Sequence, residues 1–210
     1  MRALFFIIVI QGTLFGQNRY DHTETTQKKG IICLKYNMSP INGIVYVKYH
    51  ANSGGNLQSE THYKNGKKDG PLRKWYAQGQ IKCEGNSTKG KANGFWRSWH
   101  SNGQLKDEKN YKSAKLNGLY RSWHENGQLY YERYYNEDKL NGSYKSWYDH
   151  GQLRKECQYK NDKRIGTCKS WHKNGQLRWK CTYKDGVISG IEKCWNEKGN
   201  PADCQDIFGN

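Results

Sequence analysis

The chain has 210 residues, a formal net charge of +16, and only 34% hydrophobic residues. A mean hydropathy of −1.11 would by itself place it with disordered chains, because little apolar surface is available to bury. Its eight Trp and sixteen Tyr recur at fixed places, however, which excludes simple disorder and indicates an ordered chain without a thick core. We therefore predict one repeat domain rather than two globular domains.

Residues 1–16 are predicted to be a signal peptide for secretion. Met1-Arg2 is a short positive start, residues 3–10 are apolar, and small residues precede a cleavage site near Gly16. The apolar run ends at Phe15, so it is shorter than the roughly 18 residues of a membrane-spanning helix. An uncleaved anchor is the alternative. We expect the mature protein to be exported to the periplasm, the cell surface or the extracellular space.

Residues 17–42 form an N-terminal segment that precedes the repeats. Its first part, residues 17–29, is polar, and residues 30–36 have the composition of a β-strand. We expect this segment to cap the open end of the repeat array, because an exposed sheet edge invites aggregation.

Residues 43–200 contain seven units of about 24 residues, of which the first is degenerate. In the six clear units a glycine opens the unit, a tryptophan follows five residues later, and a second glycine follows four residues after that. A fixed period of this length indicates stacked supersecondary units. Residues 201–210 are a C-terminal tail, in which Pro201 cannot donate to a sheet. The repeated tryptophan column is Trp75, Trp99, Trp123, Trp147, Trp171 and Trp195.

Each unit has the pattern of a β-hairpin. Asn102-Gly103, Asn126-Gly127 and Asn174-Gly175 lie between aromatic-rich runs, and Asn-Gly favours a two-residue type I′ turn. Such a turn fixes which residues face each other, and it places cations opposite carboxylates. The predicted fold is all-β, an elongated single-layer antiparallel sheet of successive hairpins. The predicted pairs are Arg73–Glu84, Arg97–Glu108, Arg121–Glu132 and Lys145–Glu156.

The seven cysteines suggest disulfides in an exported chain. The same register places Cys168 opposite Cys181, and Cys194 and Cys204 are one residue out of register but could still pair. These four are the disulfide candidates. The alternative is that all seven are reduced and buried. The register gives no disulfide partner for the remaining three, Cys33, Cys83 and Cys157. The absence of a Cys-x-x-Cys motif argues against a zinc site.

No set of residues has the pattern of an active site. The histidine column (His100, His124, His172) is spaced by one hairpin, or about 10 Å, so its members cannot share a metal ion. The repeated Ser-Trp-His has no orienting acid, and each repeated glutamate faces a cation, which favours its ionised form. We therefore predict no enzymatic activity and no cofactor.

The basic residues of the C-terminal third are the predicted anion-contacting set. Lys169 is expected to face Lys180 where other units have a glutamate, and like charges in opposition are unfavourable. The high net charge predicts attraction to acidic surfaces, whereas export disfavours nucleic acid as a partner. The candidates are Lys169, Lys173, Arg178, Lys180, Lys184 and Lys193.

The repeat Gly-x-x-x-x-Trp-[His/Tyr]-x-Asn-Gly-Gln-Leu-x-x-Glu-x-x-Tyr, as in residues 118–135, resembles the variant MORN repeat of bacterial YwqK-type antitoxins. The resemblance covers about residues 43–200. It implies a twisted antiparallel sheet and a non-catalytic binding role, with a toxin as one partner and lipid or protein contact in related repeats. We expect a scaffold for protein–protein recognition with Trp and Tyr as anchors. The alternative is adhesion to anionic envelope polymers or membrane lipids through a basic face.

Overall fold

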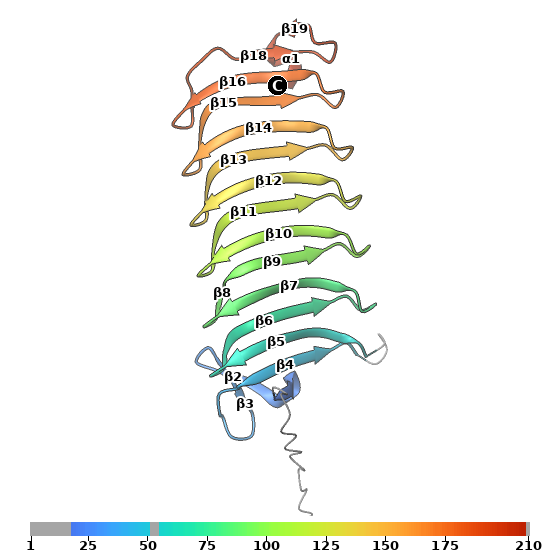
Figure 1. Cartoon of the computed structure of the whole chain (residues 1–210), viewed down its shortest axis with the longest axis vertical. Coiled ribbons are helices and arrows are strands. Elements are labelled where there is room, and N and C mark those ends of the chain that lie inside the picture. The colour runs from blue at the N-terminus through green and yellow to red at the C-terminus, as the bar shows by residue number, and fades with distance from the viewer. Residues whose placement is uncertain (1–17, 51–54, 209–210) are drawn as a thin grey trace, which may run out of the picture.

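The computed structural model describes residues 18–50 and 55–208, and the predicted signal peptide lies outside them. Within these residues 17 strands share one long sheet, which is a single layer and does not close on itself (Figure 1). From β4 (Gly43–Lys48) onward, all strand pairs described are antiparallel and most join strands that follow each other in the chain. The predicted all-β sheet of successive hairpins is confirmed.

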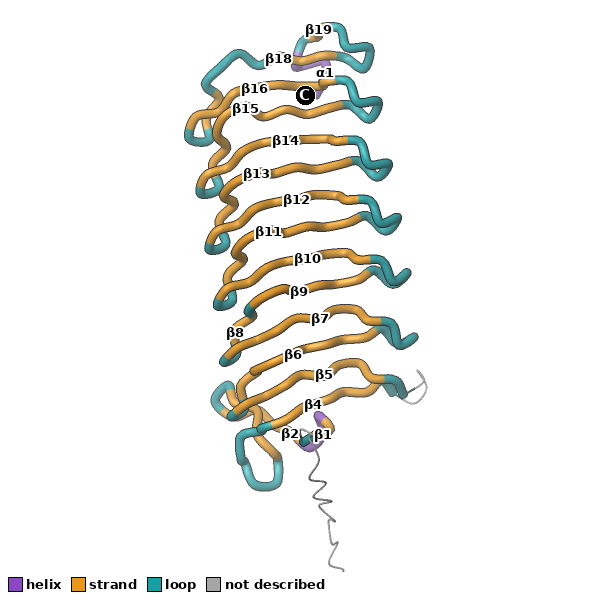
Figure 2. The backbone as a smooth tube through the Cα atoms, viewed as in Figure 1, coloured by secondary structure: helices purple, strands orange, loops and turns teal. Residues whose placement is uncertain are grey.

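Long strands run side by side across the repeat array, with a few much shorter strands among them and at its C-terminal end (Figure 2). They are β5 (Leu57–Lys64), β6 (Lys67–Trp75), β7 (Ile81–Thr88), β8 (Lys91–Ala92), β9 (Gly94–Trp99), β10 (Leu105–Lys112), β11 (Lys115–Trp123), β12 (Leu129–Asn136), β13 (Lys139–Trp147), β14 (Leu153–Lys160), β15 (Lys163–Trp171), β16 (Leu177–Lys184), β17 (Val187–Ile188), β18 (Lys193–Trp195) and β19 (Pro201–Ala202).

Short elements flank the array at both ends. At the start are β1 (Arg19–Asp21), the 3-10 helix η1 (His22–Glu24), β2 (Thr25–Lys28) and β3 (Ile31–Leu34). β1 pairs with β4 in parallel, so the outer edge of the first long strand is occupied. At the other end, α1 (Cys204–Phe208) follows β19; this one-turn helix was not predicted.

The turns within the units differ from the prediction, which is wrong in its turn type. At Asn126-Gly127, the Gly127 N–H donates to the His124 carbonyl at 2.9 Å, and the His124 N–H donates to the Gln128 carbonyl at 2.8 Å. Gly127 has a φ of 84°, whereas Asn126 is not among the described residues with positive φ. The loop therefore has three residues, with Gly127 in the left-handed position that a following bulge requires.

A bulge restores the predicted register. Trp123 lies opposite Leu129, but Ser122 lies opposite Tyr131, so Tyr130 is an extra residue in β12. The longer loop shifts the pairing by one residue and the bulge shifts it back. The predicted opposition of Arg121 and Glu132 is confirmed for this reason.

The two-residue turns with positive φ lie between the units instead. Glu137-Asp138 has φ angles of 48° and 67°, and Asn161-Asp162 has 48° and 65°. Both central residues are therefore left-handed, as a type I′ turn requires. Asp138 also accepts from the Leu116 N–H at 2.7 Å, so each such turn is bonded to the preceding unit.

Successive units are joined by side chains in repeated columns. Asn102 Nδ2 donates to the Glu125 carbonyl at 2.7 Å, which links one loop to the next. His100 Nε2 lies 3.0 Å from the Trp123 carbonyl, and His172 Nε2 lies 2.8 Å from the Trp195 carbonyl. These bonds give the histidine column a structural role in stacking.

Two clusters of buried hydrophobic side chains lie at the two ends of the sheet, in keeping with a single layer that cannot enclose a thick core. The N-terminal cluster contains Leu34, Ile41 and Val45. The C-terminal cluster is built from cysteine and aromatic side chains, namely Cys157, Cys168, Trp179, Cys181, Tyr183 and Cys194.

The structure corrects one disulfide prediction. Cys168 does lie opposite Cys181, but its disulfide is to Cys157 on the other neighbouring strand, and Cys181 is a buried free thiol. The Cα atoms of Cys157 and Cys168 are 4.3 Å apart, the spacing of a non-hydrogen-bonded pair. Cys194 and Cys204 form the second disulfide, which ties α1 to β18.

Candidate functional site

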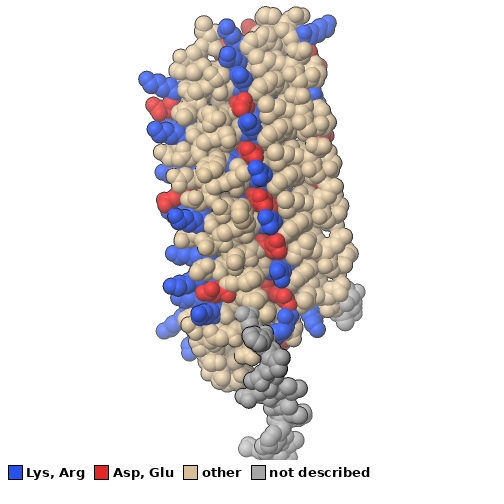
Figure 3. Space-filling model, viewed as in Figure 1, with Lys and Arg blue, Asp and Glu red and all other residues tan. Residues whose placement is uncertain are grey.

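One face of the sheet, the ladder face, carries a continuous row of alternating charges. Arg97 Nε donates to Glu108 at 2.8 Å and Arg97 Nη1 lies 3.9 Å from Glu84, so Arg97 lies between two carboxylates. Figure 3 shows a column of blue and red atoms along the sheet. In cross-strand order the row is Glu60, Arg73, Glu84, Arg97, Glu108, Arg121, Glu132, Lys145, Glu156, Lys169, Lys180 and Lys193.

The alternation stops at the C-terminal end of the row. Lys169 lies opposite Glu156 on one side and Lys180 on the other, and Lys180 lies opposite Lys193. We call these three residues the terminal lysine row. Three adjacent cations with a carboxylate at one end make this part of the ladder face the most positive.

The predicted anion-contacting set is not one patch. Lys173 lies in the loop after β15, and Lys184 lies at the far end of β16, opposite Val187. Arg178 is the extra residue of the β16 bulge, and its Nη2 donates to the Ile207 carbonyl at 2.9 Å, toward α1. The structure therefore brings together Lys169, Lys180 and Lys193, and separates the other three from them.

Each tryptophan is two residues after a ladder cation, so strand alternation assigns the tryptophan column to the ladder face, although Trp171 also borders a cavity over β14 to β16. All six tryptophans are only partly exposed. The backbone carbonyl of each contacts a Tyr or His side chain of the preceding unit. The distance is 2.8 to 3.0 Å for five of them and 3.5 Å for Trp147. Two other aromatic residues of this face are more exposed to solvent. Phe95 is 55% exposed and Tyr134 is 48% exposed, and alternation places both on the ladder face.

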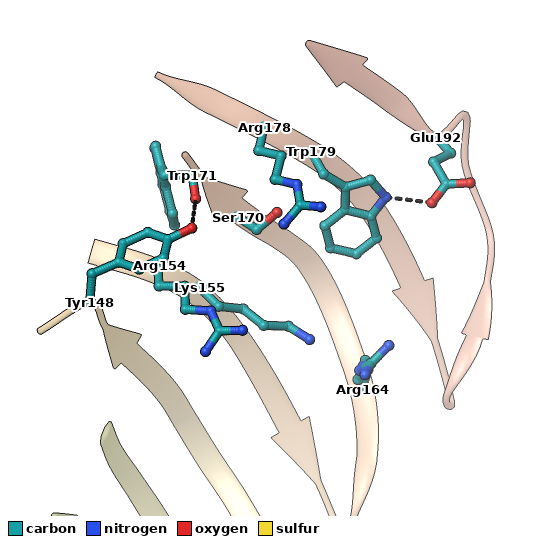
Figure 4. Close-up of a pocket in the computed structure, with 9 residues that line it drawn as sticks. All are labelled: Tyr148, Arg154, Lys155, Arg164, Ser170, Trp171, Arg178, Trp179 and Glu192. Carbon is teal, nitrogen blue, oxygen red and sulfur yellow. Dashed lines mark hydrogen bonds between the residues drawn. The ribbon is translucent and has the colours of Figure 1, made fainter. Parts of the chain in front are cut away.

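The opposite face of the sheet holds a hollow near its C-terminal end. This basic cavity has a volume of about 280 Å³ and lies over β14, β15 and β16. Lys155 and Ser170 lie opposite each other, and Ser170 lies opposite Trp179, so the three side chains share one face. Figure 4 shows all nine lining residues: Tyr148, Arg154, Lys155, Arg164, Ser170, Trp171, Arg178, Trp179 and Glu192.

Four of the nine lining residues are cations and one is a carboxylate. Burial, together with the nearby charges of Arg164 and Arg154, lowers the pKa of Lys155. Within the described chain, Arg154, Lys155 and Arg164 form no ion pair with a carboxylate. Arg164 instead donates to the Tyr159 and Tyr183 hydroxyls at 3.2 and 3.0 Å. The cavity is therefore electropositive and partly shielded from water.

Two further features distinguish the basic cavity. Glu192, its one acidic residue, accepts a hydrogen bond from Trp179 Nε1, which fixes the indole ring at the cavity wall. Ser170 Oγ is shielded from solvent and has no hydrogen-bond partner among the described residues. A buried hydroxyl without a partner is uncommon, because its desolvation is not compensated.

This cavity was not predicted from the sequence. Its signal in the sequence is a change of residue type at equivalent positions of successive repeats. Trp96, Tyr120 and Tyr144 are followed at the equivalent position by Cys168. Tyr131 is followed in the same way by Lys155. The smaller Cys168 leaves space where other units place a ring. Comparing columns across units, rather than spacing within one unit, would have found it.

The described residues contain no group of three or more His, Cys, Asp or Glu side chains arranged to hold a metal ion. Nor do residues 18–50 and 55–208 include a helix with the length and apolarity to cross a bilayer.

A family model described as MORN repeat variant matches four consecutive segments, residues 93–113, 116–137, 140–161 and 164–185. Residues 93–185 thus contain four consecutive matches to this repeat. Each matched segment spans one hairpin, from β9–β10 to β15–β16. Strands β4 to β7 continue the same sheet before the matched run. A comparison with curated proteins finds no match for the chain. MORN repeats in a sheet of this form indicate a scaffold for binding.

Proposed function

We propose that this protein is a non-catalytic, exported MORN-repeat scaffold that binds a protein partner along its ladder face. The observation that carries the proposal is the combination of alternating charges with the exposed rings of Phe95 and Tyr134 on one open face. Exposed aromatic residues anchor protein interfaces, and an ordered pattern of charge fixes the register of the partner.

The length of the face favours an extended partner. Cations and carboxylates alternate from Glu60 to Lys169, so a partner with the complementary alternation would gain contacts along several units. A toxin is the class of partner implied by the resemblance to YwqK-type antitoxins.

The test compares exposed aromatic residues on the two faces. Phe95→Ala combined with Tyr134→Ala removes both rings from the ladder face. Tyr130→Ala is the matched control. Tyr130 is 39% exposed, and its ring packs 5.2 Å from the ring of Tyr131, which lies on the face opposite the ladder face. The mature protein and both variants are used to capture partners from the organism's envelope fraction.

We expect one set of proteins to be captured by the native chain and by Tyr130→Ala, and lost with the double variant. Equal capture by all three folded proteins would show that the ladder face is not the binding surface. Circular dichroism and melting curves establish that each variant is folded.

A second candidate function is adhesion to anionic polymers or lipids of the envelope, favoured by the terminal lysine row. Binding to purified anionic polymer or to anionic vesicles would fall steeply with added salt, because exposed charges are screened. Lys180→Glu should weaken it most, since it inserts a carboxylate between Lys169 and Lys193. Salt-independent binding, or no effect of Lys180→Glu, would contradict this candidate.

A further inference from the structure

We propose that the basic cavity on the opposite face is a binding site for a small ring compound carrying a phosphate or sulfate monoester, such as a phosphorylated or sulfated sugar. This site is separate from the ladder face and does not depend on the proposed protein partner.

Three of the cations that line the cavity, Arg154, Lys155 and Arg164, form no ion pair with a carboxylate among the described residues. Figure 4 shows the side chains of Lys155 and Arg178 directed into the same space, with the guanidinium of Arg164 at its border. A half-buried ammonium among guanidinium groups is unfavourable for folding unless an anion compensates it. A phosphate monoester, with up to two negative charges, or a sulfate monoester, with one, supplies that compensation and accepts several charge-assisted hydrogen bonds at once.

Ser170 supplies a second, independent indication. Its hydroxyl lines the cavity next to Arg178, is shielded from solvent, and lacks a partner among the described residues. An oxygen of a bound monoester would satisfy it. A donor hydroxyl beside cations is the arrangement expected for an oxyanion, whereas a cationic ligand would be repelled.

The aromatic walls indicate that the anion is attached to a ring. Tyr148 and Trp179 lie on different sides of the cationic groups (Figure 4), and both rings are held in place. The Tyr148 hydroxyl donates to the Trp171 carbonyl at 2.9 Å, and Trp179 Nε1 donates to Glu192. Fixed aromatic faces bind planar or sugar rings at low entropic cost. A volume of about 280 Å³ is close to the lower end of known small-molecule sites, which suits a monosaccharide-sized ligand.

The test uses the full mature protein and phenyl phosphate as the probe, with tryptophan fluorescence and calorimetry as readouts. We expect saturable binding, tighter than that of inorganic phosphate, which lacks the ring, or of phenol, which lacks the charge. Vesicles of phosphatidylcholine with and without phosphatidic acid form a separate arm, which distinguishes a lipid headgroup from a soluble ester.

Four substitutions make the test specific. Lys155→Met should weaken phenyl phosphate binding about tenfold or more without lowering the melting temperature, because it removes a charge-assisted bond and an uncompensated charge. Ser170→Ala should weaken binding severalfold. Glu192→Gln should strengthen it, since Trp179 keeps an acceptor while a negative charge is lost. Lys180→Ala, on the ladder face, is the matched control and should leave binding unchanged.

Two results would overturn the proposal. The first is the absence of saturable phenyl phosphate binding, including the case in which only the vesicles with phosphatidic acid bind. The second is equal weakening by Lys155→Met and Lys180→Ala, which would indicate diffuse attraction to the net charge. Either result leaves the ladder-face proposal standing, because its variants and its readout are different.

Discussion

The guanidinium of Arg97 and the carboxylate of Glu108 face each other across β9 and β10, with Arg97 Nε 2.8 Å from Glu108 Oε2. Both groups keep contact with water, since their side chains are 42% and 19% exposed. One such pair therefore contributes little, about 0.2–1 kcal/mol. In the ladder, however, an inner charge has an opposite charge on both neighbouring strands.

The position of a charge in the ladder determines the sign of its effect on stability. Glu132→Lys would create three adjacent cations with Arg121 and Lys145, and it should lower the free energy of unfolding by about 1 kcal/mol. Lys180→Glu would restore the alternation and should raise it by about 0.5 kcal/mol. Denaturant unfolding at low and high salt measures both. The two differences should shrink at high salt; the same sign for both variants would contradict the ladder.

The histidine column should accept tyrosine but not phenylalanine. His172 Nε2 lies 2.8 Å from the Trp195 carbonyl, and the Tyr148 hydroxyl makes the equivalent bond to Trp171 at 2.9 Å. His172→Tyr should therefore keep the stability of the native chain, whereas His172→Phe should lose about 1 kcal/mol. Thermal unfolding of the two variants is the measurement. Equal losses would mean that the bond to the carbonyl does not stabilise the stacking.

His62 should make the protein less stable in mild acid. Burial lowers the pKa of His62 below its ordinary 6.5, with smaller lowering by Arg73 and Arg19 and an opposing effect of Glu60. As the pH falls below about 6.5, the unfolded chain binds a proton at this residue before the folded chain does. The free energy of unfolding should therefore decrease from about pH 6.5 down to the folded pKa, and His62 should contribute no slope above pH 6.5.

The control for this pH effect is His62→Gln. Chemical denaturation of the native chain and the variant at about pH 8 and about pH 5 isolates the contribution of His62. The loss of stability between the two pH values should be smaller in the variant. A loss of the same size in both proteins would assign the acid sensitivity to other groups.

The disulfides can be checked by mapping. Alkylation of the denatured, unreduced protein followed by digestion and mass spectrometry should find Cys157 linked to Cys168 and Cys181 alkylated. A peptide joining Cys168 to Cys181 would contradict the structure. Replacing Cys157 and Cys168 together by serine should cost about 2–3 kcal/mol, as the loss of a short disulfide loop does.

Pairing within a hairpin could be read from the chain because it is local. A turn and the residues on either side of it fix which side chains meet, and the facing of Arg121 and Glu132 followed from that rule. The rule succeeded although the turn type was wrong, since the loop at Gly127 and the bulge at Tyr130 shift the register in opposite directions. The sequence does not encode such a compensation in any simple pattern.

Pairing between hairpins depends on a second set of turns, which the composition did not reveal. Cys168 has cysteines opposite it on both neighbouring strands, so the register alone leaves two possible partners. In an antiparallel sheet the backbone N–H and C=O of a residue both bond to one of the two neighbouring strands. The residue is then closer to the residue opposite it on the other neighbouring strand. That geometry selects Cys157.

The amino-acid sequence by itself determined the repeat period, the hairpin, the all-β class and the pairing of cations with carboxylates, because each follows from residues close together in the chain. The tertiary structure alone decided which distant residues share a face: it joined Glu60 through Lys193 into one row, divided the predicted basic set, and gathered Lys155, Arg164 and Trp179 around a cavity. The physical reason is that face and neighbour depend on the sum of turns and bulges along the array. A shift of one residue in any of them moves a side chain to the other side of the sheet.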